Sequence, residues 1–321
     1  MRIARVEKEN VEPKGSAAAE SMGEAGRSSR MTDMMSYPYS DTYAIVNNNG
    51  DAITADEIKS QTNMQIPPTL EQFIFEGYSD RIEKIIDGLN LTHNIFNFRL
   101  LPPIIRSFKI ICLAFNYSDQ DTWLRFGKFP PKDPVIYMKA RTSLIGAFED
   151  ITCPSSVKQL DYEGELAFVI DKKCRNIEMN KALEYVGGYF VFNDISARDV
   201  QFIDKQYSRA KSFDSFGPCG PWIVTRDDIP DPNDLQLTTK VNEEVRQSSS
   251  TSKLVLNIER IITSLSSVMT LEAGDIISTG TPGGTALSMS SHLKYLQHGD
   301  IVEVEIEGIG KIKNKVKTIY F

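Results

Sequence analysis

The sequence predicts a β-rich α+β protein, in which a sandwich or barrel-like domain follows a small α+β unit. Short apolar runs separated by turn residues fill the chain from residue 109 onward. Few helical stretches lie between them, which disfavours a doubly wound sheet. The 321 residues, of which 41% are hydrophobic and 25% charged, are enough to build such a core.

Residues 1–36 differ in composition from the rest of the chain. They are rich in Gly, Ser, Ala, Glu and Met and have almost no large aliphatic residues after Val11. A segment of this composition cannot bury enough apolar surface to offset its loss of conformational entropy. We therefore expect a disordered tail over 1–36.

Residues 37–105 have the pattern of a small α+β domain. Residues 43–46 and 51–53 flank an Asn-Asn-Asn-Gly stretch and predict a β-hairpin. Residues 55–65 and 69–91 show the apolar spacing of helices. We expect this unit to serve packing or assembly rather than chemistry.

Residues 106–321 form the predicted catalytic domain. Apolar or alternating runs predict strands, and two stretches of helical spacing predict helices. The strands are expected at 110–113, 135–138, 166–170, 189–192, 222–224, 275–278 and 302–307, and the helices at 178–186 and 257–267.

Charge and cysteine content exclude several classes of protein. Lys and Arg number 36 against 43 Asp and Glu, a formal charge of −7, so a nucleic-acid-binding surface is not expected. No apolar run is long enough to span a membrane. The 4 cysteines form no CxxC pair, which favours a reduced, cytoplasmic setting over zinc or disulfide chemistry.

Three carboxylates are the strongest chemical signal. Glu163 and Glu165 are two residues apart, so in an extended strand both side chains lie on one face. Asp194 follows another apolar run and can join them. Three oxygen ligands without His or Cys suit Mg2+ or Mn2+. The alternative is the solvent face of an ordinary alternating strand.

Six sequence blocks resemble the fumarylacetoacetate hydrolase family, including its acylpyruvate hydrolases and 2-hydroxyhepta-2,4-diene-1,7-dioate isomerases. They follow in the family's order over 109–316, at 160–167, 193–201, 211–218, 241–248, 279–284 and 299–310. The resemblance implies a mixed β-sandwich roll, a homodimer and a small 2-oxo or diketo acid as substrate. It also implies Mg2+ or Mn2+ bound by Glu163, Glu165 and Asp194.

The resemblance implies roles for five further residues. Lys211 resembles the family's active-site lysine, and Lys139 resembles a lysine of its Phe-Leu-Lys segment. Gln201, Thr281 and Gly280 are expected to bind substrate. For the two lysines the alternative is a surface or strand-end position; for the other three it is a generic polar contact or a glycine-rich turn.

The chain departs from the family at a short lid helix. Where hydrolytic members carry a histidine and a glutamate, this sequence has Gln120 and Trp123. Glutamine can orient water but cannot accept its proton. Asp119, and with it Asp121, is a hypothetical substitute base, against the alternative of a solvated lid. Arg198 and Asp199 are expected to form a structural ion pair.

The leading prediction is a Mg2+- or Mn2+-dependent hydrolase of carbon–carbon bonds in small 2-oxo or diketo acids, acting through a metal-stabilised enolate. The missing lid dyad keeps alternatives open. They are an isomerase or tautomerase, a decarboxylase, a sugar-acid dehydratase, or a 2-oxo-acid binding protein of weak activity.

Overall fold

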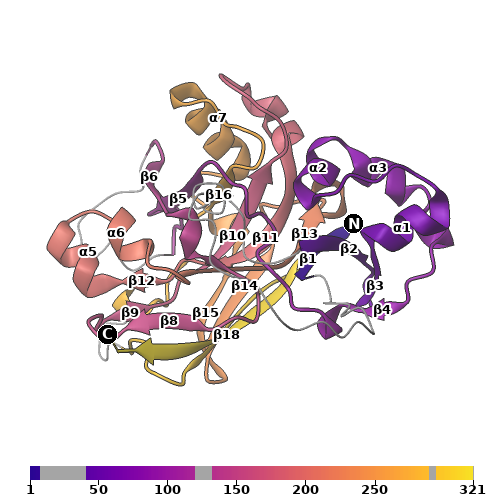
Figure 1. Ribbon diagram of the computed structural model, residues 1–321. Helices are drawn as coiled ribbons and strands as arrows, with labels where there is room; N and C mark the ends of the chain where they lie inside the picture. Colours follow the sequence, from indigo (N-terminus) through magenta and orange to yellow (C-terminus); the bar gives the residue numbers. More distant parts are fainter. Residues whose placement is uncertain (8–40, 120–131, 289–293, 321) are drawn as a thin grey trace, which may run out of the picture.

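The computed structural model describes residues 1–7, 41–119, 132–288 and 294–320 (Figure 1). Strands dominate, as the sequence predicts, and lie in mixed sheets. They are β1 Arg2–Glu7, β2 Asp41–Val46, β3 Asp51–Thr54, β4 His93–Asn94, β5 Ile110–Ala114, β6 Val135–Met138, β7 Leu144–Ile145, β8 Ile151–Pro154, β9 Leu160–Asp161, β10 Gly164–Ile170, β11 Val186–Asn193, β12 Ser196–Ala197, β13 Gly217–Thr225, β14 Gln236–Val241, β15 Glu244–Ser250, β16 Ile276–Ser278, β17 Ile301–Ile306 and β18 Gly310–Ile319.

The helices are short and few among the described residues. They are α1 Ala55–Thr62, α2 Leu70–Phe75, α3 Tyr78–Glu83, α5 Arg198–Asp204, α6 Ser208–Lys211 and α7 Ile258–Val268. The predicted helix over 69–91 is divided, because Gly77 adopts a left-handed conformation with φ 70° between α2 and α3. The predicted helix at 178–186 is a 3-10 helix, Met179–Tyr185.

Two sheets pack face to face. The larger has the strand order β4-β3-β2-β1-β13-β11-β10-β16-β5-β6, and the smaller has the order β15-β14-β17-β18-β8. Strands β10, β11 and β13 contact β14, β17 and β18 across the interface. Side chains alternate along β10, so Leu166 and Phe168 fill the core between the sheets.

The other face of the larger sheet is also covered. Ala167 and Val169 of β10 join a second apolar cluster that includes Ile58 of α1 and Phe73 of α2. In Figure 1 these N-terminal helices lie beside β1, β2 and β3. Because both faces are buried, β10 has an uninterrupted apolar run after Glu165.

The expected disordered tail is wrong for residues 1–7. Strand β1 pairs with β2 on one side and with β13 on the other. Ile3, Ala4 and Val6 are fully buried. Burial of these side chains and pairing on both edges therefore stabilise this short apolar run as a strand. Residues 8–36 of the predicted tail lie outside the described residues. Through β1 the larger sheet continues across the predicted boundary at 105/106, so the two predicted domains share one sheet.

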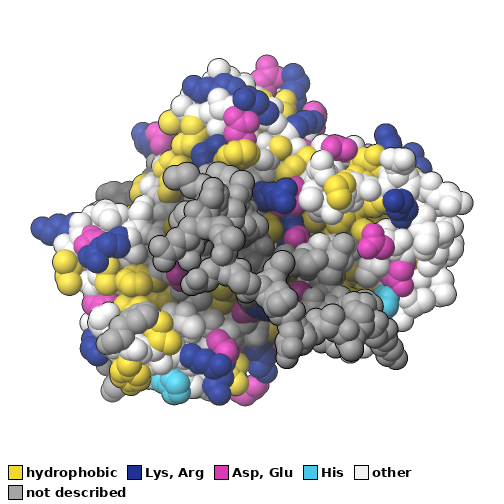
Figure 2. Space-filling view, viewed as in Figure 1, with side chains coloured by type: hydrophobic (Ala, Val, Ile, Leu, Met, Phe, Trp, Pro, Cys, Tyr) yellow, Lys and Arg dark blue, Asp and Glu magenta, His cyan; other side chains and the backbone are white. Residues whose placement is uncertain are grey.

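The described surface is mixed in charge. Basic and acidic side chains are interspersed over the visible part of the face in Figure 2. Within the described ranges, no helix is long and apolar enough to cross a membrane.

Candidate metal centre and active-site pocket

The three predicted carboxylates converge at one end of the central strands. Strands β10 and β11 are antiparallel, with Gly164 opposite Asn193, so the start of one strand lies beside the end of the other. The Asp194 N–H donates to the Glu163 carbonyl at 2.8 Å and fixes this junction. One carboxylate oxygen from each of Glu163, Glu165 and Asp194 lies within 4.8 Å of the others.

Glu165 is fully buried, as is Asp194. Its Oε2 accepts hydrogen bonds from the Ser278 hydroxyl and, at 3.1 Å, from the Gly280 N–H. Its Oε1 is buried without a hydrogen-bond partner among the described residues. Burial, followed by repulsion from Asp194 and Glu163, raises the pKa of Glu165. A cation bound between the three carboxylates would satisfy this oxygen and relieve the repulsion.

Asp194 is buried among cationic and phenolic donors. Lys139 Nζ lies 2.5 Å from its Oδ1, Lys211 Nζ lies 2.8 Å from its Oδ2, and the Tyr137 hydroxyl also donates to Oδ2. Burial raises the pKa of Asp194, but the two ammonium groups outweigh it and lower the pKa to about 2. Asp194 is therefore ionised at neutral pH.

Glu163 lies just before β10, between two cations. Lys211 Nζ is 2.5 Å from its Oε2, and Arg198 forms an ion pair with its Oε1. Arg198 Nε also pairs with Asp161 at 2.9 Å. Asp161 in turn accepts the backbone N–H groups of Ala286 and Leu287 at 2.8 and 3.1 Å. This chain of contacts ties the Glu163 carboxylate to the turn after β16.

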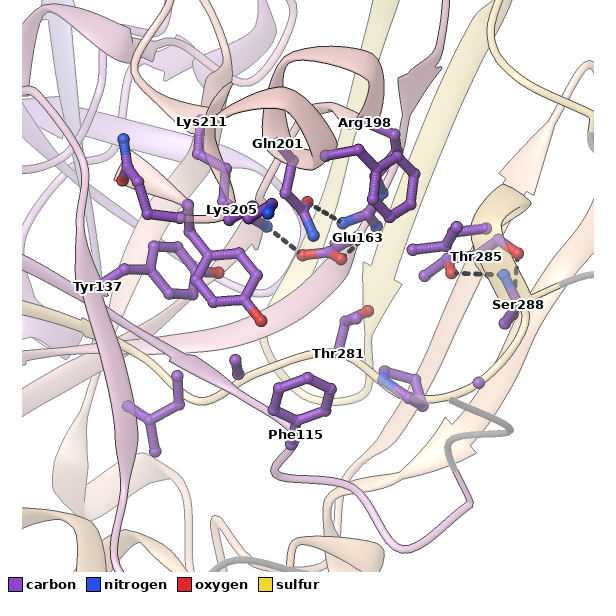
Figure 3. A pocket seen from close by; sticks show the side chains of 18 residues that line it. Phe115, Tyr137, Glu163, Arg198, Gln201, Lys205, Lys211, Thr281, Thr285 and Ser288 are labelled. Atoms are coloured by element: carbon purple, nitrogen blue, oxygen red, sulfur yellow. Dashed lines mark hydrogen bonds and ion pairs between the residues drawn. The ribbon is translucent and has the colours of Figure 1, made fainter. Parts of the chain in front are cut away.

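A pocket of about 240 Å³ opens onto Glu163 (Figure 3). Arg198, Lys205 and Lys211 contribute three cationic side chains to its wall, against the single carboxylate of Glu163. The remaining wall is largely apolar or aromatic, and it comprises Leu113, Ala114, Phe115, Tyr137, Gln201, Phe202, Gln206, Tyr207, Thr281, Pro282, Gly283, Thr285, Leu287 and Ser288. The pocket therefore suits a small anion with an apolar portion.

Of the predicted site residues, Lys211 and Gln201 line this pocket beside Glu163. Gln201 Oε1 accepts from Arg198 Nη1 at 3.0 Å, which sets the orientation of its amide (Figure 3). Thr281 also lines the pocket, but its hydroxyl donates to the Gly164 carbonyl at 2.9 Å and accepts from Gln247 Nε2 at 2.8 Å. Through these two hydrogen bonds the Thr281 hydroxyl stabilises the start of β10.

Two predicted substrate-binding residues instead hold the carboxylates. Lys139 is buried, and its Nζ lies 2.5 Å from Asp194 Oδ1, 2.9 Å from the Phe216 carbonyl and 3.4 Å from the Ile195 carbonyl. The Gly280 N–H donates to Glu165. Neither residue is among those that line the pocket.

The predicted lid base is directed elsewhere. Asp119 Oδ2 accepts from the Ser249 hydroxyl at 2.7 Å and pairs with Lys253 at 3.0 Å, and Asp119 does not line the pocket. Gln120, together with Asp121 and Trp123, lies outside the described residues. The expected Arg198–Asp199 ion pair is wrong, because Asp199 accepts the Lys158 N–H instead.

Sequence reasoning missed four residues that organise the site: Tyr137, Asp161, Ser278 and Lys205. Three of them lie in strands, where alternation cannot tell which polar side chains meet a ligand. Asp161 offered a signal, because a carboxylate two residues before Glu163 lies on the same face. Lys205 had none, since it follows α5 among other polar residues.

Comparison with known proteins agrees with this geometry. The family model for the fumarylacetoacetate (FAA) hydrolase C-terminal region matches residues 109–317. The chain is 41% identical over 219 residues to the mitochondrial oxaloacetate tautomerase Fahd2a of Rattus norvegicus, covering 67% of this chain and 68% of the relative.

Two solved structures cover nearly all of both chains. The 5-carboxymethyl-2-hydroxymuconate delta-isomerase of Mycobacterium smegmatis is 31% identical, with a TM-score of 0.69 and 99% of each chain covered. The fumarylacetoacetate hydrolase of Exiguobacterium antarcticum is 32% identical, with a TM-score of 0.73, covering 99% of this chain and 100% of the other. Members of this family are enzymes that act on small organic acids. From the matched region and these relatives, the chain belongs to the fumarylacetoacetate hydrolase family.

Proposed function

We propose that this protein catalyses keto–enol tautomerisation of small 2-oxo acids of the oxaloacetate type, with Mg2+ or Mn2+ held by Glu163, Glu165 and Asp194. The observation that carries the proposal is the buried, unpartnered Glu165 Oε1, which converges with the other two carboxylates beside a cation-lined pocket. An all-oxygen ligand set of this kind suits a hard divalent cation.

A bound divalent cation would supply Lewis acidity for the negative charge that develops on the 2-oxo oxygen. Lys211 would add to this stabilisation. Burial lowers the pKa of Lys211, but Asp194 and Glu163 outweigh it and raise the pKa above its usual value. Lys211 is therefore an ammonium ion that donates to both carboxylates, and a third N–H would be available to a substrate.

Gln201 would orient the substrate carboxylate. Arg198 holds the Gln201 carbonyl oxygen, so the amide N–H groups are available to an anion in the pocket. Hydrogen bonds to a charged acceptor are stronger than neutral ones and fix its direction. The C1 carboxylate and 2-oxo oxygen would then face Glu163 and Lys211.

The described pocket supports enolisation better than hydrolysis. Its one carboxylate, Glu163, is paired with both Lys211 and Arg198. Lys211 is protonated, and burial raises the pKa of Tyr207, so both act as donors at neutral pH. Among the described residues that line the pocket, none is placed to take a proton from a hydrolytic water. Keto–enol interconversion still moves a proton between C3 and the 2-oxo oxygen, but solvent can accept it from one atom and return it to the other, with no nucleophilic water to activate. The similarity to a tautomerase and to an isomerase supports the same choice.

The test follows the enol form of oxaloacetate in the ultraviolet while pyruvate is measured in parallel with a lactate dehydrogenase assay. We expect Mg2+ or Mn2+ to be required for faster loss of the enol, without matching pyruvate formation. Glu165→Gln should abolish the acceleration, and Glu178→Gln, an exposed surface change, should not. Pyruvate formed in step with substrate loss, from oxaloacetate or an acylpyruvate, would establish a lyase or hydrolase instead.

Homodimer formation and a cytoplasmic location stay predictions of the sequence.

A further inference from the structure

The pocket-lining residues of α5 and its C-cap run from the buried Arg198 to the exposed Lys205. Arg198 and Gln201 are spaced i and i+3 and share one face of α5, and Lys205 follows the helix as its C-cap. All three line the pocket, together with Phe202. Arg198 is committed to Glu163 and Asp161, and Gln201 lies one step further out.

Lys205 ends this set of pocket-lining residues as an exposed cation. It caps α5 in a left-handed conformation with φ 55°, and its N–H donates to the Gln201 carbonyl at 3.0 Å. In the part of the chain that the structure describes, its ammonium group has no carboxylate within ion-pair distance, unlike Arg198 and Lys211. Figure 3 shows Lys205 among the groups that face the cavity.

The spacing along α5 separates the backbone of Lys205 from that of Arg198. Lys205 lies seven residues beyond Arg198, and a helix rises about 1.5 Å per residue, so the two Cα atoms are separated by roughly 10 Å along the axis. Phe202, 46% exposed, lies between them in the sequence and also lines the pocket. A substrate whose 2-oxo end lies at Glu163 and Lys211 would extend past this apolar wall toward Lys205.

We propose that Lys205 is a specificity residue that binds the distal carboxylate of a 2-oxo dicarboxylic acid. This inference rests on the proposed function for the placement of the 2-oxo end, and it adds the reason why a diacid is preferred to a monoacid. An unpaired ammonium group at the rim of a cation-lined pocket attracts a second negative charge, whereas a terminal methyl group gains nothing from it.

The experiment compares 2-oxoglutarate with 2-oxopentanoate, which has the same chain length but no distal carboxylate. Exchange of the C3 hydrogens for deuterium is followed by NMR, and binding is followed by calorimetry, both with the Mg2+-loaded full chain. The variants are Lys205→Met, which keeps the length of the side chain but removes its charge, and Lys205→Arg. Lys59→Met, an exposed change on α1 far along the chain from the pocket residues, is the matched control.

We expect wild type to bind and exchange the diacid about tenfold better than the monoacid, which corresponds to ~1.4 kcal/mol. Lys205→Met should remove this preference by raising the KM and Kd for the diacid alone, while Lys205→Arg retains it. Equal binding of the two acids by wild type, or equal losses for both in Lys205→Met, would overturn the role of Lys205. Preferential binding of the diacid without any exchange would instead reject the proposed tautomerase activity and leave the Lys205 assignment standing.

Discussion

Lys211 Nζ lies 2.8 Å from Asp194 Oδ2, although the two residues are 17 positions apart, one at the end of α6 and the other directly after β11. The same ammonium group lies 2.5 Å from Glu163 Oε2. A buried carboxylate cluster is costly without compensating charge, and Lys211 supplies part of it before any metal binds. Under the proposed function, Lys211 would both support the metal ligands and face the substrate in the pocket.

Replacing this lysine should separate the two roles. We expect Lys211→Met to lower kcat about 100-fold, the size of effect seen when one electrostatic group at a reacting oxygen is removed. Without Mg2+, the variant should also lose ~3–5 kcal/mol of stability, because two buried carboxylates lose their partner. Added Mg2+ should restore much of that loss in a thermal unfolding experiment. If Lys211→Met lowers the affinity for Mg2+ by as large a factor as it lowers kcat, Lys211 acts only by positioning the carboxylates that bind the metal.

The raised pKa of Glu165 predicts that the folding stability of the metal-free protein depends on pH. Its pKa is raised in the folded state, so the folded protein holds a proton there that the unfolded chain releases above about 4.5. Its contribution to stability is therefore present at low pH and lost as the pH rises through the raised pKa. Urea unfolding in a chelating buffer should show this loss in wild type relative to Glu165→Gln. With saturating Mg2+, the loss of wild-type stability at higher pH should disappear. If the stabilities of wild type and Glu165→Gln change with pH in parallel in the chelating buffer, the raised pKa does not belong to Glu165.

Arg198 should prove essential to the geometry of Glu163. Arg198→Met leaves the buried carboxylates of Asp161 and Glu163 without their shared cation, and we expect a loss of ~3–5 kcal/mol in stability. Metal affinity should fall about 10- to 100-fold, as for other groups that orient a ligand. Arg198→Lys keeps the charge but cannot reach both carboxylates. Its stability and its affinity for Mg2+ should therefore lie between those of wild type and Arg198→Met. Calorimetric Mg2+ titration of the three proteins checks the order.

The turn after β16 and the turn before β17 offer a matched pair of glycine substitutions. Gly284 and Gly299 have φ values of 95° and 92°, so alanine is strained at both. A Cβ at Gly284 would lie 2.0 Å from the Arg246 carbonyl oxygen, whereas nothing lies within 4 Å of one at Gly299. We expect Gly299→Ala to cost ~1–2 kcal/mol, and Gly284→Ala to cost more and to reduce turnover. Equal unfolding free energies for the two variants would show that the clash is relieved without cost.

The sequence predicted the carboxylate trio because its signal is local. Glu163 and Glu165 share a face by strand periodicity, and Asp194 directly follows the neighbouring strand, so pairing of β10 with β11 suffices to bring them together. The central strands were predictable for a related reason: burial on both faces leaves continuous apolar runs such as that of β10.

Contacts between distant segments were not predictable in this way. Lys139 resembled a substrate-binding lysine, yet three oxygen partners hold its Nζ against Asp194 and the chain around it. Strand β1 was missed because its six residues gain stability only from β2 and β13, which are distant in the sequence. Arg198 pairs with Asp161 rather than its neighbour Asp199, because the side chain of an N-terminal helix residue can reach the adjoining β9 strand.

Under the proposed function, Glu163, Glu165 and Asp194 hold one divalent cation that is needed for enolisation. A Mn2+ titration followed by electron paramagnetic resonance, with C3 hydrogen–deuterium exchange of a 2-oxo acid measured on the same samples, tests both parts of this proposal together. We expect one tightly bound Mn2+ per chain, exchange that rises in proportion to occupancy, and loss of both in Glu165→Gln. Exchange at full rate in the metal-free protein, or unchanged Mn2+ binding by Glu165→Gln, would contradict it.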